Sequence, residues 1–425
     1  MLSWRTADAS RLVGITKLRV ILPTIAMLSC ALAYTQTKNS CLDCHSALPD
    51  PLGVPQEKFA QDVHSQKGLT CASCHGGDPT SDDPDKAMSR KAGWKGKITR
   101  SGIPQLCGSC HSDAAHMRQF NPALRTDQLS QYKTSVHGKL LGSGDSKVAV
   151  CTDCHSVHDM RAPSDPRSPV NPVNVAGTCA HCHADASYMS SYKIPTNQFA
   201  EYNKGVHHEA LVGRGDLSAP TCTTCHGNHG ATPPGVASVA NVCSTCHAFQ
   251  AQLFDSSPHK PAFAAAGLPA CVTCHSNHGI VHPMDDFIGT GDKSVCMQCH
   301  SQGDPGYNAA AQMKRQLLEL ATATSNAGQI LGQAERSGME VGQAQLDLTQ
   351  ANDALVKSRV TIHSFNVARV AADVKPGMEI AAKDYHAGQK ALAERNYRRI
   401  GLGVSLVAIA LALIGLRLYI RQIES

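Results

Sequence analysis

Apolar residues follow a helical period only in the last third of the chain. Between Cys41 and His300 the segments are short and rich in Pro, Gly, Ser and Asp, which is typical of loops with short helical turns. After Gly303 a helical face appears, and Ser337-Gly338 predicts where that helix ends. The positions on this face are Met313, Leu317, Leu320, Thr324, Ala327 and Leu331.

A second helix is predicted from about residue 339 to residue 374. Its apolar positions recur every seven residues, with Ala344 and Ala351 beside them. They are Val341, Leu348, Leu355 and Ile362. Pro376-Gly377 predicts a break, after which a third helix continues toward the C-terminus. We therefore expect an antiparallel helical hairpin and a stalk. Such a hairpin offers a surface for self-association, although the sequence does not define an oligomeric state.

The C-terminal segment is apolar on every side. Ile400–Leu416 is 17 residues long and contains no charge, so we expect residues 400–420 to form a transmembrane helix. Arg417 is close enough to its end to extend toward the polar headgroups. The alternative is a core helix buried inside the protein.

The N-terminal segment has a basic part followed by a short apolar run. Val20–Ala33 is 14 residues long, too short for a span of about 17–25 residues, and Ala31-Leu32-Ala33 resembles a cleavage site. We therefore expect residues 1–33 to be a signal peptide that places the main body on the periplasmic face of the bacterial inner membrane. An uncleaved N-terminal anchor and lipidation of Cys30 are the alternatives. The basic residues are Arg5, Arg11, Lys17 and Arg19.

The chemistry of the chain lies in nine copies of the motif Cys-x-x-Cys-His. They use 18 of the 19 cysteines and leave only Cys30, which excludes a disulfide framework. This motif is the attachment signature of c-type haem, because two thiols at this spacing reach both vinyl groups of one porphyrin. Zinc is the alternative, but it gives no reason for a His directly after each pair. The predicted thioether residues are Cys41, Cys44, Cys71, Cys74, Cys107, Cys110, Cys151, Cys154, Cys179, Cys182, Cys222, Cys225, Cys243, Cys246, Cys271, Cys274, Cys296 and Cys299.

The histidine inside each motif is expected to bind the haem iron from one side. These proximal ligands are His45, His75, His111, His155, His183, His226, His247, His275 and His300. Thirteen other histidines remain, which is enough for nine bis-histidine haems, although Met ligation is an alternative. The predicted distal ligands are His64, His116, His137, His158, His207, His229, His259, His278 and His363.

Internal repeats support most of these distal assignments. The stretch from His64 to His300 resembles one module used four times: an upstream His, one motif, a spacer and a second motif. Copies two to four extend their first motif to Cys-x-x-Cys-His-x-x-His, whereas the first copy has Gly76-Gly77-Asp78 there. Because the motif His already binds its own iron, the later His is expected to bind a neighbouring haem.

The remaining histidines are less well determined by sequence. His363 lies within an apolar stripe, where it is either a hydrogen-bonded core residue or the ninth distal ligand. That stripe is Val356, Val360, His363, Val367 and Val370. His208 competes with its neighbour His207, and His181 lies inside its own motif as a bystander. His282 has no assigned role, and His386 is expected on the surface.

Composition and charge agree with a core made largely of cofactor. Aromatic residues are 4% and charged residues 17% of the chain, so protein side chains alone supply little apolar bulk. The formal net charge is +5, of which the predicted signal peptide contributes +3. Nine ferric haems with their propionates would add about −9, so the basic balance does not indicate nucleic-acid binding.

Over about residues 41–300 the motifs resemble those of periplasmic multihaem cytochromes c of the cytochrome c3-like and doubled-motif type. The resemblance implies closely spaced bis-histidine haems that act as an electron wire. The long helices after the last motif are also similar to those of multihaem nitrite and hydroxylamine enzymes. The Cys-x-x-Cys-Lys variant of many nitrite reductases is absent, however.

We therefore expect a mainly α fold with extensive loops and little or no β-sheet. The expected parts are residues 1–33, a nonahaem region at 34–303 with four two-haem modules plus one N-terminal haem, a hairpin and stalk at 304–399, a span at 400–420 and a cytoplasmic tail at 421–425.

The expected function is electron transfer by a membrane-anchored periplasmic nonahaem cytochrome c, without catalytic residues. Its predicted partners are a quinol-oxidising or cytochrome b-type membrane protein and periplasmic redox proteins. The alternative is a reductase with one five-coordinate haem that acts on a small nitrogen or sulfur oxyanion. The motifs at Cys41 and Cys71 are the candidates for such a haem, because neither has the x-x-His extension. An extracellular polymerising cytochrome is disfavoured by the C-terminal apolar helix.

Overall fold

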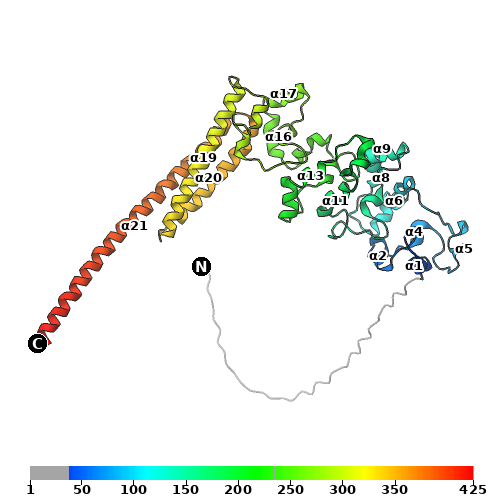
Figure 1. The fold of residues 1–425 in the computed structure, drawn as a ribbon, viewed down its shortest axis with the longest axis horizontal. Coiled ribbons are helices and arrows are strands. Elements are labelled where there is room, and N and C mark those ends of the chain that lie inside the picture. The colour runs from blue at the N-terminus through cyan, green and yellow to red at the C-terminus, as the bar shows by residue number, and fades with distance from the viewer. Residues whose placement is uncertain (1–37, 234, 425) are drawn as a thin grey trace, which may run out of the picture.

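The computed structural model describes residues 38–233 and 235–424, and within them the regular structure is helical, with no strand. The predicted mainly α, loop-rich fold is thereby confirmed. Two parts are visible in Figure 1: a region of short helices and loops, and a bundle of long helices that ends in one extended helix. The predicted signal peptide and Cys30 lie outside the described residues.

The first part, residues 38–304, contains only short helices. The α-helices are α1 Ser40–His45, α2 Gln56–Ala60, α3 Val63–Gln66, α4 Cys71–His75, α5 Pro84–Ala87, α6 Ile103–His111, α7 Ala114–Arg118, α8 Gln128–Thr134, α9 Val136–Gly142, α10 Cys151–His155, α11 Pro172–His183, α12 Ala186–Met189, α13 Gln198–Tyr202, α14 Val206–His208, α15 Cys222–His226, α16 Ala248–Asp255, α17 His259–Ala266 and α18 Val272–His275. The tighter or wider turns are η1 Arg90–Ala92, η2 Arg100–Gly102, η3 Ser190–Tyr192, η4 Glu209–Gly213, η5 Val239–Thr245, η6 Asp285–Phe287 and η7 Val295–Gln298. Each Cys-x-x-Cys-His motif coincides with a helical turn or its end, which holds the two thiols on one side.

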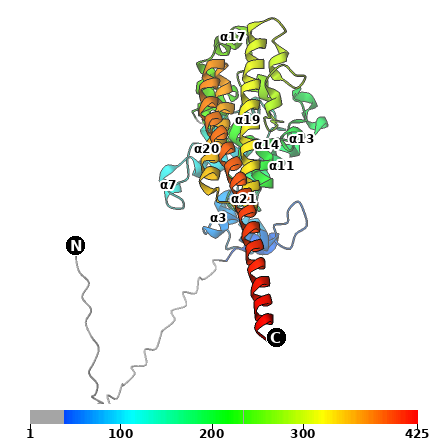
Figure 2. The same cartoon turned by 90° about the vertical axis from the view of Figure 1, so that its left-hand side faces the viewer.

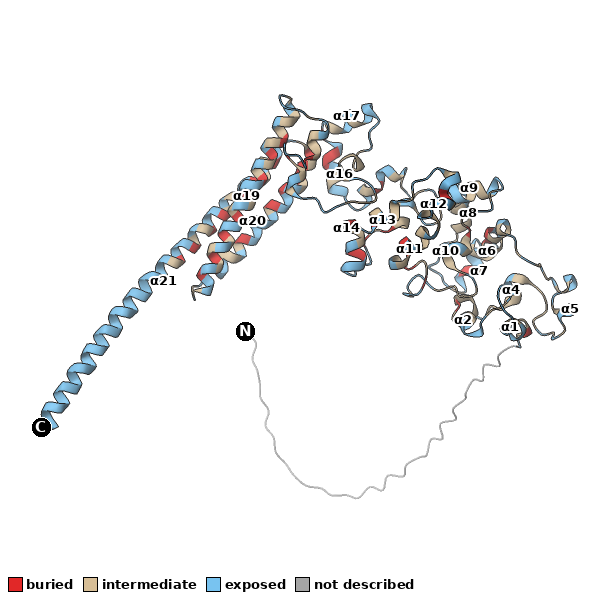
Figure 3. Cartoon of the chain, viewed as in Figure 1, coloured by how far each residue is buried: buried red, intermediate tan, exposed pale blue. Residues whose placement is uncertain are grey.

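This first part has little apolar core of its own. Its one cluster of fully packed apolar residues among those described consists of Ala210, Leu211 and Ala219. Figure 3 shows most of the region as exposed or intermediate. A chain of this length normally buries a much larger core, so the apolar surface that stabilises the region has to come from bound groups.

The second part is a bundle of three long helices: α19 Pro305–Arg336, α20 Gly342–Thr361 and α21 Val367–Glu424. Figure 2 shows the helices side by side, with α21 continuing beyond the other two. Buried positions alternate at three and four residues, the spacing of a coiled-coil seam. In α19 they are Ala310, Met313, Leu317, Leu320, Thr324, Ala327, Leu331 and Ala334. All six positions of the predicted helical face are therefore buried, as expected.

The turn between the second and third helices differs from the sequence-based expectation. The second helix was expected to reach residue 374, but α20 ends at Thr361 and is followed by the turn η8 Ile362–Ser364. Phe365 then adopts a left-handed conformation with φ of 51°, and the Asn366 side chain accepts the backbone N–H of Arg369 at 3.0 Å. An Asn cap after a left-handed residue starts a new helix at this point. His363 therefore lies in a turn and not on a helical stripe.

Pro376-Gly377 does not break the helix, contrary to expectation, because α21 runs through it. Gly377 has a packing role instead: a Cβ atom there would lie 2.9 Å from side-chain atoms of Leu320 and of Ala354. The glycine allows the three helices to approach closely, and this packing outweighs the helix-breaking tendency of the dipeptide.

Beyond the bundle, α21 continues as an exposed helix. Residues 396–424 are exposed throughout, and the apolar window within α21 has a mean hydropathy of 2.2 with none of it buried. Among the described residues this is the one helix long and apolar enough to cross a membrane, which suggests membrane anchoring. The apolar segment is therefore not a core helix buried inside the protein.

One buried carboxylate interrupts the seam of the bundle. The Asp384 side chain is 0% exposed, and neither oxygen has a hydrogen-bond partner among the described residues. Burial, followed by the nearby charge of Asp347, raises the pKa of Asp384. A raised pKa in the folded state means that stability is greatest when the carboxyl is protonated and is lost as the pH rises through that pKa.

We therefore expect Asp384→Asn to raise the free energy of unfolding of the bundle by about 1 kcal/mol at neutral pH. The gain should shrink as the pH falls and Asp384 in the unmodified protein becomes protonated. Thermal unfolding followed by far-ultraviolet circular dichroism measures both effects. Glu379→Gln is the matched control, because it removes the same charge from an exposed position of the same helix. Equal shifts for both variants would contradict this explanation.

Candidate haem sites

The chain leaves the first motif of each module through the same unusual turn. The residue after the motif histidine has positive φ in all four modules: 69° at Gly76, 63° at Ser156, 79° at Gly227 and 65° at Ser276. The accompanying ψ values lie near 180°, a region that only glycine adopts easily, so the two serines are strained. This turn carries the x-x-His histidine of modules two to four away from its own motif.

Eight of the nine motif histidines face a second histidine. In each pair the ring centroids are between 6.0 and 6.4 Å apart. The pairs are His75–His158, His111–His64, His155–His229, His183–His137, His226–His278, His247–His207, His275–His363 and His300–His259. The partners of the motif histidines are eight of the nine histidines that the sequence predicts as distal ligands.

This spacing fits one iron between each two rings. A first-row metal binds an imidazole nitrogen at about 2 Å, so two rings on opposite sides of one iron have centroids about 6 Å apart. The angles between the ring planes vary from 8° for His155–His229 to 85° for His64–His111, whereas the spacing hardly changes. Direct ring packing would instead favour particular angles. The residues present therefore fit bis-histidine haem.

The pairs obey a simple rule across the repeats. The first motif of a module is paired with the x-x-His of the next module, and the second motif is paired with the upstream His of its own module. Pairs of the first kind are His75–His158, His155–His229 and His226–His278. Pairs of the second kind are His111–His64, His183–His137, His247–His207 and His300–His259. Each of modules two to four thus supplies a second histidine for the first motif of the module before it.

The helical bundle supplies the second histidine for the first motif of the last module. His275 belongs to the first motif of module four, and its partner is His363 in the turn between α20 and α21, 6.0 Å away and tilted by 22°. The His363 Nδ1 atom lies 2.8 Å from the carbonyl oxygen of Val360, which orients the ring and leaves Nε2 free. The sequence offered His363 only as one of two interpretations, because no repeat marks it.

Cysteines of consecutive motifs are neighbours along the whole region. In three of these steps the two sulfur atoms are direct neighbours: Cys107–Cys151, Cys179–Cys222 and Cys243–Cys271. The other steps bring thiols close enough to interact electrostatically, as in Cys41–Cys71, Cys74–Cys110, Cys154–Cys182, Cys225–Cys243 and Cys274–Cys296. The nine motifs therefore follow one another in space in the order in which they occur in the sequence.

Burial prepares the paired imidazoles for metal binding. For His155 and His229, burial is the largest influence on the pKa and lowers it in both. A lowered pKa keeps the ring neutral near neutral pH, and only a neutral imidazole has a lone pair to give to iron.

Two ring pairs also have a carboxylate behind them. Nδ1 of His64 lies 3.1 Å from Asp62, and Nδ1 of His300 lies 3.1 Å from Asp304. Although burial opposes it, hydrogen bonds from His64 and from the backbone of Met160 hold the pKa of Asp62 below its ordinary value. A carboxylate behind a ligand fixes the ring and increases its basicity.

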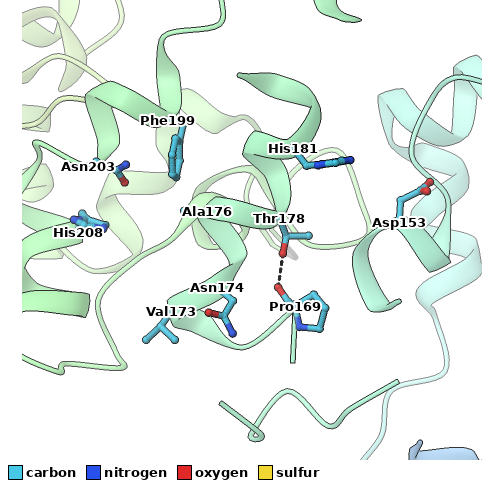
Figure 4. A pocket seen from close by; sticks show the side chains of 11 residues that line it. Asp153, Pro169, Val173, Asn174, Ala176, Thr178, His181, Phe199, Asn203 and His208 are labelled. Carbon is cyan, nitrogen blue, oxygen red and sulfur yellow. Dashed lines mark hydrogen bonds between the residues drawn. The ribbon is translucent and has the colours of Figure 1, made fainter. Parts of the chain in front are cut away.

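Two histidines outside the pairs line a cavity of about 570 Å³ beside the motif helix α11. Figure 4 shows His181 on α11 and His208 on α14, with the Thr178 hydroxyl donating to the carbonyl oxygen of Pro169 at 2.7 Å. The volume is in the range of cofactor sites. His208 also packs edge-on against Tyr202, at 5.4 Å between ring centroids.

His116 and His45 do not form a pair with each other. His116, predicted as a distal ligand, contacts the Phe120 ring at 5.2 Å, and no motif histidine stands across from it in the described chain. His45 likewise has no second histidine at the spacing of the eight pairs. His116 lies five residues after His111, and its role as a distal ligand stays a prediction.

Comparisons with known proteins support the binding of haem c. The family described as cytochrome c3 matches residues 63–184, and the family described as doubled CXXCH motif matches residues 213–252. The C-type polyheme cytochrome OmcC of Geobacter sulfurreducens is 26% identical over 119 residues, which are 28% of this chain. The matched part spans only 14% of that relative. No solved structure matches the chain.

The family matches cover the first two modules and part of the third, where the structure places motif histidines opposite histidines of the same or the next module. The matched relative is named as a polyheme cytochrome. From its motifs, its paired rings and these matches, the chain is a multihaem c-type cytochrome, and parts of it are similar to the cytochrome c3 and doubled CXXCH motif families.

Proposed function

We propose that this chain is a membrane-anchored periplasmic cytochrome that carries electrons along nine covalently attached haems. The observation that supports it most strongly is the set of eight imidazole pairs at 6.0–6.4 Å. A c-type haem with two axial imidazoles exchanges one electron with little rearrangement of its ligands. The 18 motif cysteines would fix the haems covalently, so that their spacing does not change during turnover.

The ligand roles follow from the pairs. We assign each motif histidine as proximal ligand, and His64, His137, His158, His207, His229, His259, His278 and His363 as distal ligands. Because the partner histidine of most pairs comes from another segment, each site ties two segments together. The protein thereby stabilises the relative positions of successive sites, and electron transfer depends on those positions.

The order of the haem sites along the wire is the order of the motifs in the sequence. The thiol contacts support a linear arrangement that starts at α1 and ends beside the bundle (Figure 1). At the bundle end, Arg359 pairs with Asp285 at 2.8 Å and Lys314 pairs with Asp286 at 2.8 Å. These ion pairs dock the last module onto the bundle.

The bundle also acts as a spacer. The haem region docks near the turn that precedes α21, and about 50 Å of helix separate Val367 from Ile400, where the apolar segment begins. A quinol-oxidising or cytochrome b-type partner would therefore need a redox centre that extends well beyond the membrane surface. Periplasmic redox proteins can reach the wire directly.

The test is the haem content and redox behaviour of the full chain. We expect nine haems c per chain from the pyridine haemochrome absorbance, with the matching increase in intact mass. When a soluble redox protein then accepts electrons from the reduced protein, all nine haems should become oxidised. As a control, the double variant Cys296→Ala and Cys299→Ala should lose one haem. Free thiols in the intact chain, or haems that cannot be oxidised by any external acceptor, would overturn the proposal.

A further inference from the structure

The described histidines form eight imidazole pairs and no ninth. All 22 histidines lie within the residues that the structure describes, and eight pairs account for 16 of them. His45 is the one motif histidine without a partner. The five others lie elsewhere: His116 against Phe120, His181 and His208 at the cavity beside α11, His282 on an exposed loop and His386 on the stalk.

His45 nevertheless has the local structure of an iron ligand. Its Nδ1 atom lies 2.9 Å from the carbonyl oxygen of Leu52, which selects the tautomer that leaves Nε2 available. The backbone N–H of Val54 donates to the His45 carbonyl oxygen at 3.0 Å, and Ser40 is tied to Pro79 and Ser81 by hydrogen bonds. The motif helix α1 is therefore held firmly, and among the described residues no histidine stands opposite His45.

The pairing rule explains why no histidine reaches this position. A partner of the first kind would come from the x-x-His place of module one, but that residue is Asp78, which accepts hydrogen bonds from Thr80 in its own loop. A partner of the second kind would be an upstream histidine, and no histidine precedes His45 in this sequence. The first motif of module one does have its partner, since His75 faces His158.

The position of His45 allows electrons to reach it. The Asn39 side-chain amide, at the start of the motif helix of His45, donates to Sγ of Cys71 in the next motif at 3.9 Å, so the second haem site is its neighbour. In Figure 1 the helix α1 lies at the end of the haem region remote from the bundle. A site here is the terminus of the wire.

Resting on the proposed function, we propose that His45 binds its haem iron from one side only, and that the opposite axial position is open to a small exogenous ligand. The ligand class is that of small neutral lone-pair donors that bind ferrous haem, of which CO and NO are examples. The eight bis-histidine sites are closed to such ligands because both axial positions are filled. The chain thus combines one exchangeable site with eight electron-transfer sites.

CO binding to the reduced full-length protein tests this directly. We expect one CO per chain of nine haems from the absorbance change on titration, and one high-spin ferric signal in the electron paramagnetic resonance spectrum of the oxidised protein. The double variant Cys41→Ala and Cys44→Ala should keep eight haems and lose the CO site. His282→Ala should bind one CO, like the unmodified protein.

Two results would overturn the inference. The first is nine low-spin haems without CO binding, which would mean that a thioether or amine occupies the sixth position of this iron. The second is a protein that binds CO only after His116→Ala, which would assign His116 as the missing ligand. The haemochrome count separates these outcomes from a failure of the proposed function, because both leave nine haems attached.

Discussion

Replacing His363 with alanine is expected to convert one low-spin haem, the one attached at Cys271 and Cys274, to a high-spin state. Its ring lies 6.0 Å from that of His275, and in the described chain no other histidine is placed across from this motif. Loss of an axial imidazole should raise the reduction potential of this haem by on the order of 100 mV, since axial ligands set haem potentials over about 0.8 V. The stoichiometry of CO binding should rise by one per chain.

Matched variants separate ligation from structure. His363→Met keeps a ligand of suitable length, so we expect the haem to remain low-spin with a raised potential. His386→Ala removes an exposed histidine from the same bundle, where it contacts Gln389, and should change neither spin state nor potential. A low-spin spectrum of His363→Ala, indistinguishable from that of the unmodified protein, would show that His363 does not bind iron.

The His363 site shows where sequence reasoning reaches its limit. The nine motifs and the repeated x-x-His are local signals, so they predict the haem attachment sites and seven of the paired distal histidines from the order of residues alone. His363 is 63 residues beyond the last motif histidine and belongs to no repeat. Its role depends on the docking of the bundle onto module four, which is a tertiary contact.

The helical bundle shows a second limit. The heptad positions predict which residues are buried, because the seam depends on spacing alone. The break at residues 362–366 and the continuous helix through Pro376 depend instead on the left-handed Phe365 and on the close packing at Gly377. In both places a three-dimensional contact overrides the local propensity of the sequence.

The role of His116 as a distal ligand stays a prediction that the observed ring pairs do not support. A histidine close to a motif resembles a ligand in the sequence, but the short helix α7 turns it toward Phe120. The pairing rule derived from the structure is stricter than proximity, because it states which module supplies each ligand. Applied to the sequence, the rule gives no place to His116 and leaves His45 without a partner.

A chain that ends after residue 399 is expected to move from the membrane to the soluble fraction. The removed part contains Ile400–Leu416, 17 residues without a charge, and all of them are exposed in the structure. Apolar side chains at the centre of a span contribute about −0.3 to −0.6 kcal/mol each to insertion, so a run of this length supplies the anchoring free energy. Fractionation of membranes with detection by haem absorbance measures the change.

The bundle and the haem sites should survive this truncation, because the truncated chain keeps the contact of Arg395 with Ser337, which holds α21 against the end of α19. Haem content and the spin state of every haem are the controls, and both should equal those of the full chain. Ala410→Arg is a milder variant that places one charge within the apolar segment, at a cost of about 2.5–3.5 kcal/mol, and should weaken membrane association without abolishing folding. If the truncated chain stayed in the membrane with nine haems, the anchor would lie elsewhere, and an uncleaved N-terminal segment would be the segment to remove next.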